Sequence, residues 1–294
     1  MSLYVAAFGF GLVIAAVIAI AAVGFTMQFA VTNMLNLAYG QVMITSAFVA
    51  YAVNSAGVNI WICLLVAAVS GSILSVLLNR FLYAPFQRKG IPLVGMVIVS
   101  VAVSLVLSNI LLAIAGPDNV SYLQSSGPTY SLGSFQLTAA EIGIIAISIV
   151  LMIGIHVILV YTRLGRAMRA TAANASLARN SGVPTVRIVD IVWLITGGLC
   201  GVAGAVTSMN SGSFTVADGS SLIITVLAAA VVGGAGQPYG AMLGALIIGE
   251  VTSLSAAAIS PEYEQVAAFG LLIAVLIFRP RGILARVGVG SSPK

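Results

Sequence analysis

Long apolar runs separated by short polar segments dominate the pattern of the chain. A helix needs about 20 predominantly apolar residues to cross the hydrocarbon core of a membrane. A shorter apolar run, at residues 222–232, is long enough only for a half-helix. The last of the long runs, residues 240–278, is divided in two by a polar segment at Ser260–Glu264. The pattern predicts an all-α, polytopic transmembrane helix bundle with seven to nine membrane segments, some of them broken or re-entrant. The long runs cover residues 8–31, 37–56, 60–79, 92–115, 139–161, 188–209 and 240–278.

The composition excludes a soluble protein. Hydrophobic residues make up 60% of the 294 residues and charged residues only 6%, whereas soluble domains contain about 25% charged residues. The first charged residue is Arg80, which leaves no room for a soluble N-terminal domain. The first apolar run is too long for a signal-peptide core and no basic residue precedes it, so we expect it to stay as a membrane helix. We expect residues 1–294 to form a single transmembrane domain.

The positive charges predict the orientation in the membrane. All 12 Lys and Arg residues lie in three segments, Arg80–Lys89, Arg163–Arg187 and Arg279–Lys294. Basic segments beside membrane helices stay on the cytoplasmic side, so we expect a plasma (inner) membrane protein with its N-terminus outside and its C-terminus in the cytoplasm. The longest external segment, residues 116–138, is rich in Gly, Pro and Ser and predicts a loop. This topology accounts for the net charge of +5 without a nucleic-acid partner.

Titratable side chains are too scattered to predict a catalytic or metal site. For His156, the only histidine, we expect packing or hydrogen bonding between helices rather than a proton relay. Asp190 closely follows the second basic segment, so we expect an ion pair with Arg187 or a neighbour. Glu250 lies within an apolar run, where a structural partner and a place along a substrate path are equally good explanations. The glycine-rich stretch at 231–244 lacks the Lys-Ser/Thr ending of a nucleotide-binding loop and favours a break between short helices.

An uncharged polar segment, NMLNLAYGQVM, separates the first two apolar runs. It includes Asn36, Tyr39, Gly40 and Gln41. Because unsatisfied polar groups are costly in lipid, these side chains must face protein or water. Two interpretations are equally open: the segment lines the path of a neutral or zwitterionic solute, or Asn36 and Gln41 hydrogen-bond helices together.

The basic loop at residues 163–187 predicts a short helix held between two membrane runs. Asn174 can cap the start of this helix and residues 175–181 can form it. Gly182 can end it, and Pro184 prevents its continuation. Such a helix is compatible with an ordinary bend of the chain at the membrane interface. It also makes a rigid protrusion that can insert into a cleft of a partner protein and transmit the partner's motion.

At this loop the sequence resembles the LivH-type permease subunits of branched-chain amino acid ABC importers. GRAMRATAANASLARNSGV resembles the cytoplasmic loop with which that family docks on its ATPase subunit. NLAYGQ resembles the family's Asn-x-Ala-His-Gly-Glu stretch, VVGGAGQPYGAMLGALIIG its glycine-rich segment, and RPRGILAR its C-terminal ending. The likeness extends from about Gly24 to Arg286, with the motifs in the same order and spacing.

The resemblance implies a transport subunit that forms half of a translocation path, is not an enzyme and holds no cofactor. It implies three kinds of partner besides the lipid bilayer: a second permease subunit (LivM-type or an identical copy), two ATPase subunits that carry ATP and Mg²⁺, and an external solute-binding protein. We expect the substrate path to include Asn36, Tyr39, Gly40, Gln41 and Glu250. We expect coupling to the ATPase through Asn174, Ala175, Ser176, Leu177, Ala178, Arg179 and Gly182.

Two departures from the family pattern bear on the solute. Tyr39 stands where the family usually has His, and Gln41 where it commonly has Glu. Both replacements are neutral at pH 7, so urea or a short-chain amide is an alternative to branched-chain amino acids or a related small polar solute. An ion-coupled secondary transporter, for which Glu250 and His156 would matter, and a nonconducting membrane scaffold are the rival classes of protein.

Overall fold

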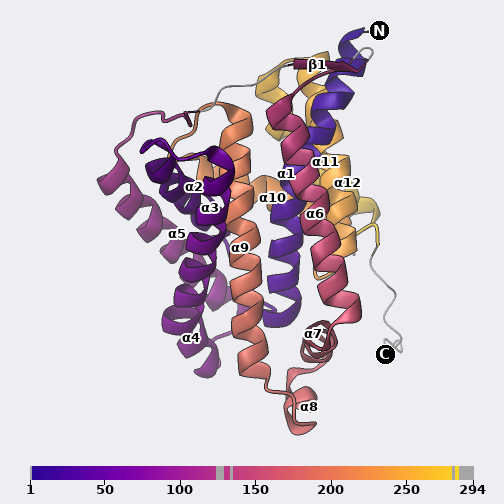
Figure 1. Ribbon diagram of the computed structural model, residues 1–294. Coiled ribbons are helices and arrows are strands. Elements are labelled where there is room, and N and C mark those ends of the chain that lie inside the picture. Colours follow the sequence, from indigo (N-terminus) through magenta and orange to yellow (C-terminus); the bar gives the residue numbers. More distant parts are fainter. Residues whose placement is uncertain (1, 124–128, 133–134, 280–281, 285–294) are drawn as a thin grey trace.

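Helices that run between two ends of the molecule make up most of the fold (Figure 1). The computed structural model describes residues 2–123, 129–132, 135–279 and 282–284. The first half contains α1 (Ser2–Thr32), α2 (Tyr39–Asn54), α3 (Ile60–Leu78), a π-helical turn (Asn79–Tyr83), α4 (Ala84–Arg88), α5 (Leu93–Ala115), β1 (Thr129–Leu132) and β2 (Phe135–Thr138). The second half contains α6 (Ala139–Tyr161), α7 (Arg163–Ala173), α8 (Ala175–Asn180), α9 (Thr185–Ser211), α10 (Asp218–Gly233), α11 (Pro238–Ala258), a 3₁₀ turn (Pro261–Tyr263) and α12 (Glu264–Phe278).

Six helical segments in the described part of the chain are long and apolar enough to cross a membrane. They comprise most of α1, the continuous segment Ile60–Arg88, and the whole of α5, α6, α9 and α11. The helices α2 and α10 have 16 residues each and α12 has 15. The predicted polytopic helix bundle, with long spans and shorter segments among them, is therefore confirmed.

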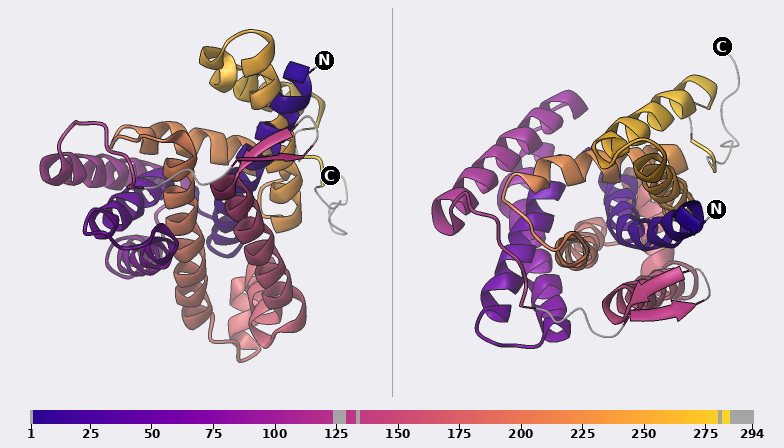
Figure 2. Two further views of the ribbon diagram at one scale, coloured as in Figure 1. Left: turned by 45° about the horizontal axis from the view of Figure 1, so that its top comes forward. Right: turned by 90° about the horizontal axis from the view of Figure 1, so that it is seen from above.

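Helix α9 stands between two groups of helices (Figures 1 and 2). On one side lie α2, α3 and α5, and on the other lie α1, α6, α11 and α12. The most apolar stretches of α1 and α9 are 72% and 67% buried, whereas those of α5 and α6 are only 17% and 22% buried. The first pair thus forms the interior of the bundle, and the second pair presents apolar side chains outward, as suits contact with lipid.

Small residues set the closest contacts between the helices. Gly249 of α11 lies against the backbone of Ala15 in α1, and Gly201 of α9 lies against the carbonyl of Ala67 in α3. A β-carbon at either glycine would collide with the facing backbone. Such residues let membrane helices approach closely enough for extensive van der Waals contact.

Two shorter helices begin inside the bundle rather than at its ends. The Cys200 thiol, midway along α9, donates a hydrogen bond to the carbonyl of Tyr39 at 3.3 Å, so α2 begins level with the middle of α9. Gly40, in the first turn of α2, packs on the carbonyl of Gly219, in the first turn of α10. The chain between α1 and α2 is non-helical, so α2 starts within the bundle and not at one of its ends.

The basic segments gather at the end of the bundle opposite the N-terminus (Figure 1). Arg80 and Arg179 line one cavity there, and Arg169 and Leu284 line another. Most of the third basic segment lies outside the described residues, but the Ile283 amide donates to the carbonyl at position 232 at 2.9 Å and so fixes the chain at this end. This grouping is what a common cytoplasmic location requires; the orientation itself stays a prediction.

A β-hairpin occupies part of the segment that the sequence predicts as a loop. Strands β1 and β2 pair antiparallel, with Thr129 opposite Thr138 and Leu132 opposite Phe135. Thr138 then caps α6: its hydroxyl oxygen accepts from the Glu141 amide at 3.2 Å, and the Glu141 carboxylate accepts from the Thr138 amide at 2.7 Å. This reciprocal capping box joins the hairpin rigidly to the helix.

An aromatic cluster holds the neighbouring loops at the same end. Phe214, between α9 and α10, pairs through its backbone with Val120, and its ring lies 5.0 Å from that of Phe48. The Tyr122 hydroxyl donates to the carbonyl of Ala47 at 2.9 Å. Burial raises the pKa of Tyr122, which keeps the hydroxyl protonated for this role. The loop after α5 and the loop after α9 are thereby fixed to α2.

Candidate functional site

The polar segment after α1 satisfies its own non-helical backbone. Asn36 Oδ1 accepts hydrogen bonds from the amide of Ala38 at 3.2 Å and from the hydroxyl of Tyr83 at 3.0 Å. The Ser100 hydroxyl of α5 accepts from the Leu37 amide at 3.1 Å. Non-helical backbone at membrane depth is tolerated only where protein or water supplies such partners. Asn36 therefore stabilises the non-helical backbone at this position.

Tyr39 and Gln41 lie at the junction of α2, α9 and α10. Tyr39 is buried, and its hydroxyl faces the carbonyl of Thr196 at 3.4 Å. The Gln41 side chain packs against Gly219, and its Oε1 is buried without a hydrogen-bond partner among the described atoms. Together with Gly40, these predicted path residues form one group with Asn36 around the start of α2, but they do not line the outer cavity described below.

Glu250 lies apart from that group. Its carboxylate packs against Gly11 of α1, and both carboxylate oxygens are buried without a hydrogen-bond partner among the described atoms. A β-carbon at Gly11 would take the space that this carboxylate fills. The structure thus brings four of the five predicted path residues together and separates the fifth.

The remaining titratable groups within the bundle have local partners. His156 Nδ1 lies 2.8 Å from the hydroxyl of Tyr239 on α11, so the predicted helix-to-helix contact is confirmed. The predicted ion pair of Asp190 is wrong: its carboxylate accepts a hydrogen bond from the Asn79 amide group at 2.9 Å instead. Asn79 belongs to the π-helical turn after α3, which turns its side chain toward α9. Within the described ranges, no three His, Cys, Asp or Glu residues gather to hold a metal ion.

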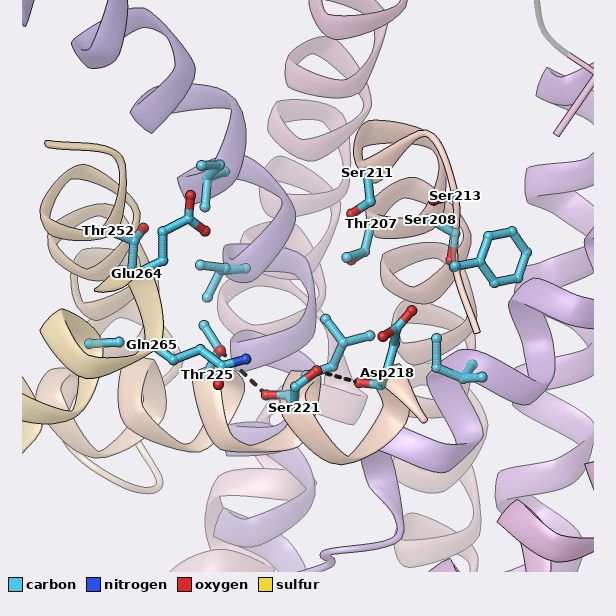
Figure 3. Close-up of a pocket in the computed structure, with 16 residues that line it drawn as sticks. Thr207, Ser208, Ser211, Ser213, Asp218, Ser221, Thr225, Thr252, Glu264 and Gln265 are labelled. Atoms are coloured by element: carbon cyan, nitrogen blue, oxygen red, sulfur yellow. Dashed lines mark hydrogen bonds between the residues drawn. The ribbon is translucent and has the colours of Figure 1, made fainter. Parts of the chain in front are cut away.

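A polar cavity of about 330 Å³ lies between α1, α2, α9, α10, α11 and α12. Figure 3 shows its polar side chains converging from helices that are far apart in the sequence. It occupies the half of the bundle away from the basic segments, because α12 contributes only its first turns and its other end leads to residues 279–284. We name it the outer cavity. Its polar lining consists of Thr207, Ser208, Ser211 and Ser213, then Asp218, Ser221 and Thr225 of α10, Thr252 of α11, and Glu264 and Gln265 of α12.

The outer cavity combines carboxylates with an apolar wall. Asp218 and Glu264 face it from opposite sides (Figure 3). Ile14, Ile18 and Ile44 contribute apolar surface from α1 and α2. No Lys, Arg or His occurs among its described lining residues. Its size is at the lower end of the range that is usual for small-molecule sites.

Sequence reasoning missed this cavity, although a signal was present. Residues 207, 208 and 211 carry hydroxyl groups at a spacing that places them on one face of a helix. Asp218, Ser221 and Thr225 form a second polar stripe of the same kind. A polar stripe on an otherwise apolar membrane helix faces protein or a water-filled space. The meeting of the two stripes depends on the return of the chain into the bundle between α9 and α10. The short apolar run at residues 222–232 indicates a half-helix there, but it does not show which helices that half-helix meets.

The predicted loop helix forms as α8, one residue shorter than expected. Asn174 Oδ1 accepts from the Leu177 amide at 3.0 Å and from the Ser176 hydroxyl at 2.7 Å. Gly182 has a φ of +84°, a conformation that glycine adopts without strain. The predicted cap and stop are therefore confirmed. Figure 1 shows α8 as the outermost element at the basic end.

Leu177 and Ala178, two neighbouring apolar residues of α8, face opposite environments. Ala178 is only 6% exposed, and its carbonyl accepts from the Val183 amide at 3.0 Å. Leu177 is 62% exposed. Arg179 donates through Nε to the Thr185 hydroxyl at 3.3 Å, which ties α8 to the start of α9. The helix is thus anchored on one side and presents a leucine on the other.

Comparisons with known proteins agree with these features. A polytopic helical membrane protein with an internal polar cavity and a protruding, anchored loop helix has the organisation of a transport permease. The chain belongs to the family described as branched-chain amino acid transport system / permease component, whose profile matches residues 7–276. It follows that the chain is a multi-pass inner-membrane permease subunit of an ABC importer.

Three relatives illustrate the likeness. The high-affinity branched-chain amino acid transport system permease protein BraD of Pseudomonas aeruginosa is 30% identical over 297 residues, with 94% of each chain covered. The corresponding LivH protein of Salmonella typhimurium is 29% identical over 292 residues, again covering 94% of each chain. A probable LivH protein of Methanocaldococcus jannaschii is 29% identical over 281 residues, covering 89% of this chain and 86% of its own. No solved structure shows a significant match.

Proposed function

We propose that this subunit forms half of a translocation path that is opened and closed through α8. A second permease subunit, LivM-type or an identical copy, completes the path. Two ATPase subunits bind ATP and Mg²⁺ and dock at the basic end, and an external solute-binding protein delivers the solute to the opposite end. The supporting observation is the pair Leu177 and Ala178, one exposed and the other anchored on the same rigid helix.

Coupling in this scheme is a matter of differential binding. ATP favours one arrangement of the ATPase pair, and a docked α8 gives the permease the same preference. For this, α8 must move as a rigid body with the membrane helices. Its cap at Asn174 and the bond between Arg179 and Thr185 supply that rigidity. An exposed leucine on a rigid helix is suited to fill an apolar cleft in a partner.

Branched-chain amino acids are the proposed solutes. The permeases named LivH and BraD, which are similar to this chain over nearly its whole length, carry that description. The alternative of urea or an amide depends on the neutral residues Tyr39 and Gln41, and neither lines the outer cavity. The proposal for amino acids therefore does not require a titratable group at those two positions.

Reconstitution tests the proposal against its rivals. The chain is co-purified with its native partners, placed in proteoliposomes and supplied with its solute-binding protein loaded with L-leucine, L-valine, urea or acetamide. We expect ATP-dependent uptake of the amino acids and none with ADP. Uptake by the chain alone under an ion gradient would contradict the proposal in favour of a secondary transporter, and the absence of any uptake would favour a scaffold.

A further inference from the structure

Most of the hydroxyl groups on the described lining residues of the outer cavity are arranged as acceptors. Four of them give their hydrogens to backbone carbonyls of their own helices: Thr207 to Ala203 at 2.6 Å, Ser221 to Asp218 at 2.9 Å, Thr225 to Ser221 at 3.4 Å, and Thr252 to Gly249 at 2.9 Å. Figure 3 shows two of these bonds along α10. A hydroxyl that donates its only hydrogen to a carbonyl still offers lone pairs. These four positions therefore present acceptors to an occupant.

The carboxylates of Asp218 and Glu264 also favour an occupant that donates hydrogen bonds. Asp218 Oδ2 accepts from the Thr215 amide at 2.8 Å, which fixes the carboxylate at the first turn of α10. Glu264 begins α12 on the opposite side of the cavity. With no cation among the described lining residues, the field in the cavity is negative. An occupant rich in N–H donors, and above all one with a positive charge, complements this lining.

Ser208 contributes a hydroxyl group that can act as a hydrogen-bond donor in the outer cavity. It is 2% exposed, it lines the outer cavity, and its Oγ has no hydrogen-bond partner among the described atoms. Buried hydroxyl groups are nearly always hydrogen-bonded. Unlike the four hydroxyls above, Ser208 keeps its hydrogen free to donate, and it can therefore bind an acceptor such as a carboxylate oxygen of the occupant.

The apolar wall of the cavity limits the rest of the occupant. Ile14, Ile18 and Ile44 line it together with Leu222 and Ala268. Aliphatic surface of this kind favours an aliphatic side chain, because its burial removes apolar area from water. A cavity of about 330 Å³ suits a solute of amino-acid size.

We propose that the outer cavity is a solute-binding site for a zwitterionic aliphatic α-amino acid, in which Asp218 and Glu264 bind the ammonium group and Ser208 binds the carboxylate. The inference rests on the proposed transport role and deepens it by assigning the solute class to named residues. Urea offers N–H donors but no charge to balance the two carboxylates. An aliphatic carboxylic acid without the amine would meet two like charges.

Neutral, nearly isosteric variants test the carboxylates during transport. In the reconstituted complex, Asp218→Asn and Glu264→Gln should each lower the rate of L-leucine uptake about 10-fold or more, since a charged hydrogen bond is lost. ATP hydrolysis stimulated by the loaded binding protein should persist, which separates this result from a failure of coupling. Glu262→Gln, an exposed acid on the adjacent 3₁₀ turn that does not line the cavity, is the matched control and should leave uptake unchanged. Unchanged uptake in both cavity variants would overturn the assignment.

A labelling measurement tests the site without any transport. Ser211→Cys places a thiol at an exposed position of the lining, while the native Cys63 and Cys200 are both buried. A cationic methanethiosulfonate reagent should label this thiol about 10-fold faster than an anionic one, and the ratio should fall toward one when Asp218→Asn and Glu264→Gln are added. L-leucine should slow labelling, and neither urea nor 4-methylpentanoate should. Equal rates for the two reagents, or protection by urea as strong as that by leucine, would overturn the proposal even if ATP-driven uptake is normal.

Discussion

Gly40 lies directly against the backbone carbonyl of Gly219, so the two helices that begin inside the bundle meet at their first turns. This contact joins the polar segment after α1 to the helix that carries Asp218 into the outer cavity. A side chain at Gly40 would collide with this backbone and push α2 and α10 apart. The contact therefore connects the buried polar segment with the proposed solute site.

Gly40→Ala should destabilise the protein by about 1–3 kcal/mol, because the added methyl group overpacks the contact with α10. The measurement is thermal unfolding of the purified protein in detergent. Gly154→Ala is the control: Gly154 lies within α6 with no atom near the position of a β-carbon. Alanine there should keep or raise the melting temperature. Equal effects of the two substitutions would show that the contact is not tight.

Leu177→Asp should abolish transport while membrane insertion and the melting temperature stay normal. The residue is 62% exposed, so the change removes an apolar contact with a partner rather than one within the chain. We expect ATPase stimulation by the loaded binding protein to fall about 10-fold or more, as at a central interface residue. Leu177→Met should retain activity. Normal uptake by Leu177→Asp at wild-type expression would contradict the coupling role.

Asn174→Ala should weaken α8 by about 1 kcal/mol through loss of its N-terminal cap. Hydrogen exchange at the Leu177 amide, which donates to Asn174 at 3.0 Å, should accelerate about 5-fold. Uptake should fall in parallel, and Asn174→Ser, which can still cap, should retain most of both properties. Faster exchange with unchanged uptake would show that coupling does not need a rigid α8.

Tyr83→Phe separates the two interpretations of Asn36. The tyrosine hydroxyl donates to Asn36 Oδ1 at 3.0 Å in a buried site, so its loss should cost about 1 kcal/mol of stability. A lower melting temperature with normal uptake by the remaining folded protein is the expected result. A normal melting temperature with impaired uptake would favour a role of this segment in the solute path.

Local chemistry made much of the fold predictable. The apolar runs located the membrane helices to within a few residues, and the cap and stop of α8 follow from Asn174 and Gly182 alone. The partner of Asp190 could not be predicted, because Asn79 lies 111 residues away and the expected Arg187 was nearer in sequence. The hairpin at Thr129–Thr138 was hidden within a segment of loop-like composition.

The candidate site was predictable only in part. The group around Asn36 was visible because its polar residues are adjacent in sequence. The outer cavity needs α1, α2, α9, α10, α11 and α12 to converge, and that depends on close backbone contacts such as Gly249 with Ala15. Periodicity shows that Ser221 and Thr225 share a face, but it does not show what that face meets.

The coupling role of α8 is tested most directly by measuring on which side of the membrane α8 lies and which protein covers it. In a Leu177→Cys variant, a membrane-impermeant thiol reagent should label the cysteine in inverted membrane vesicles stripped of peripheral proteins, and not in intact cells. Adding back the ATPase subunits should protect it from the reagent. Labelling from the outside of intact cells, or no protection by any ATPase, would contradict the claim that α8 couples ATP hydrolysis to transport.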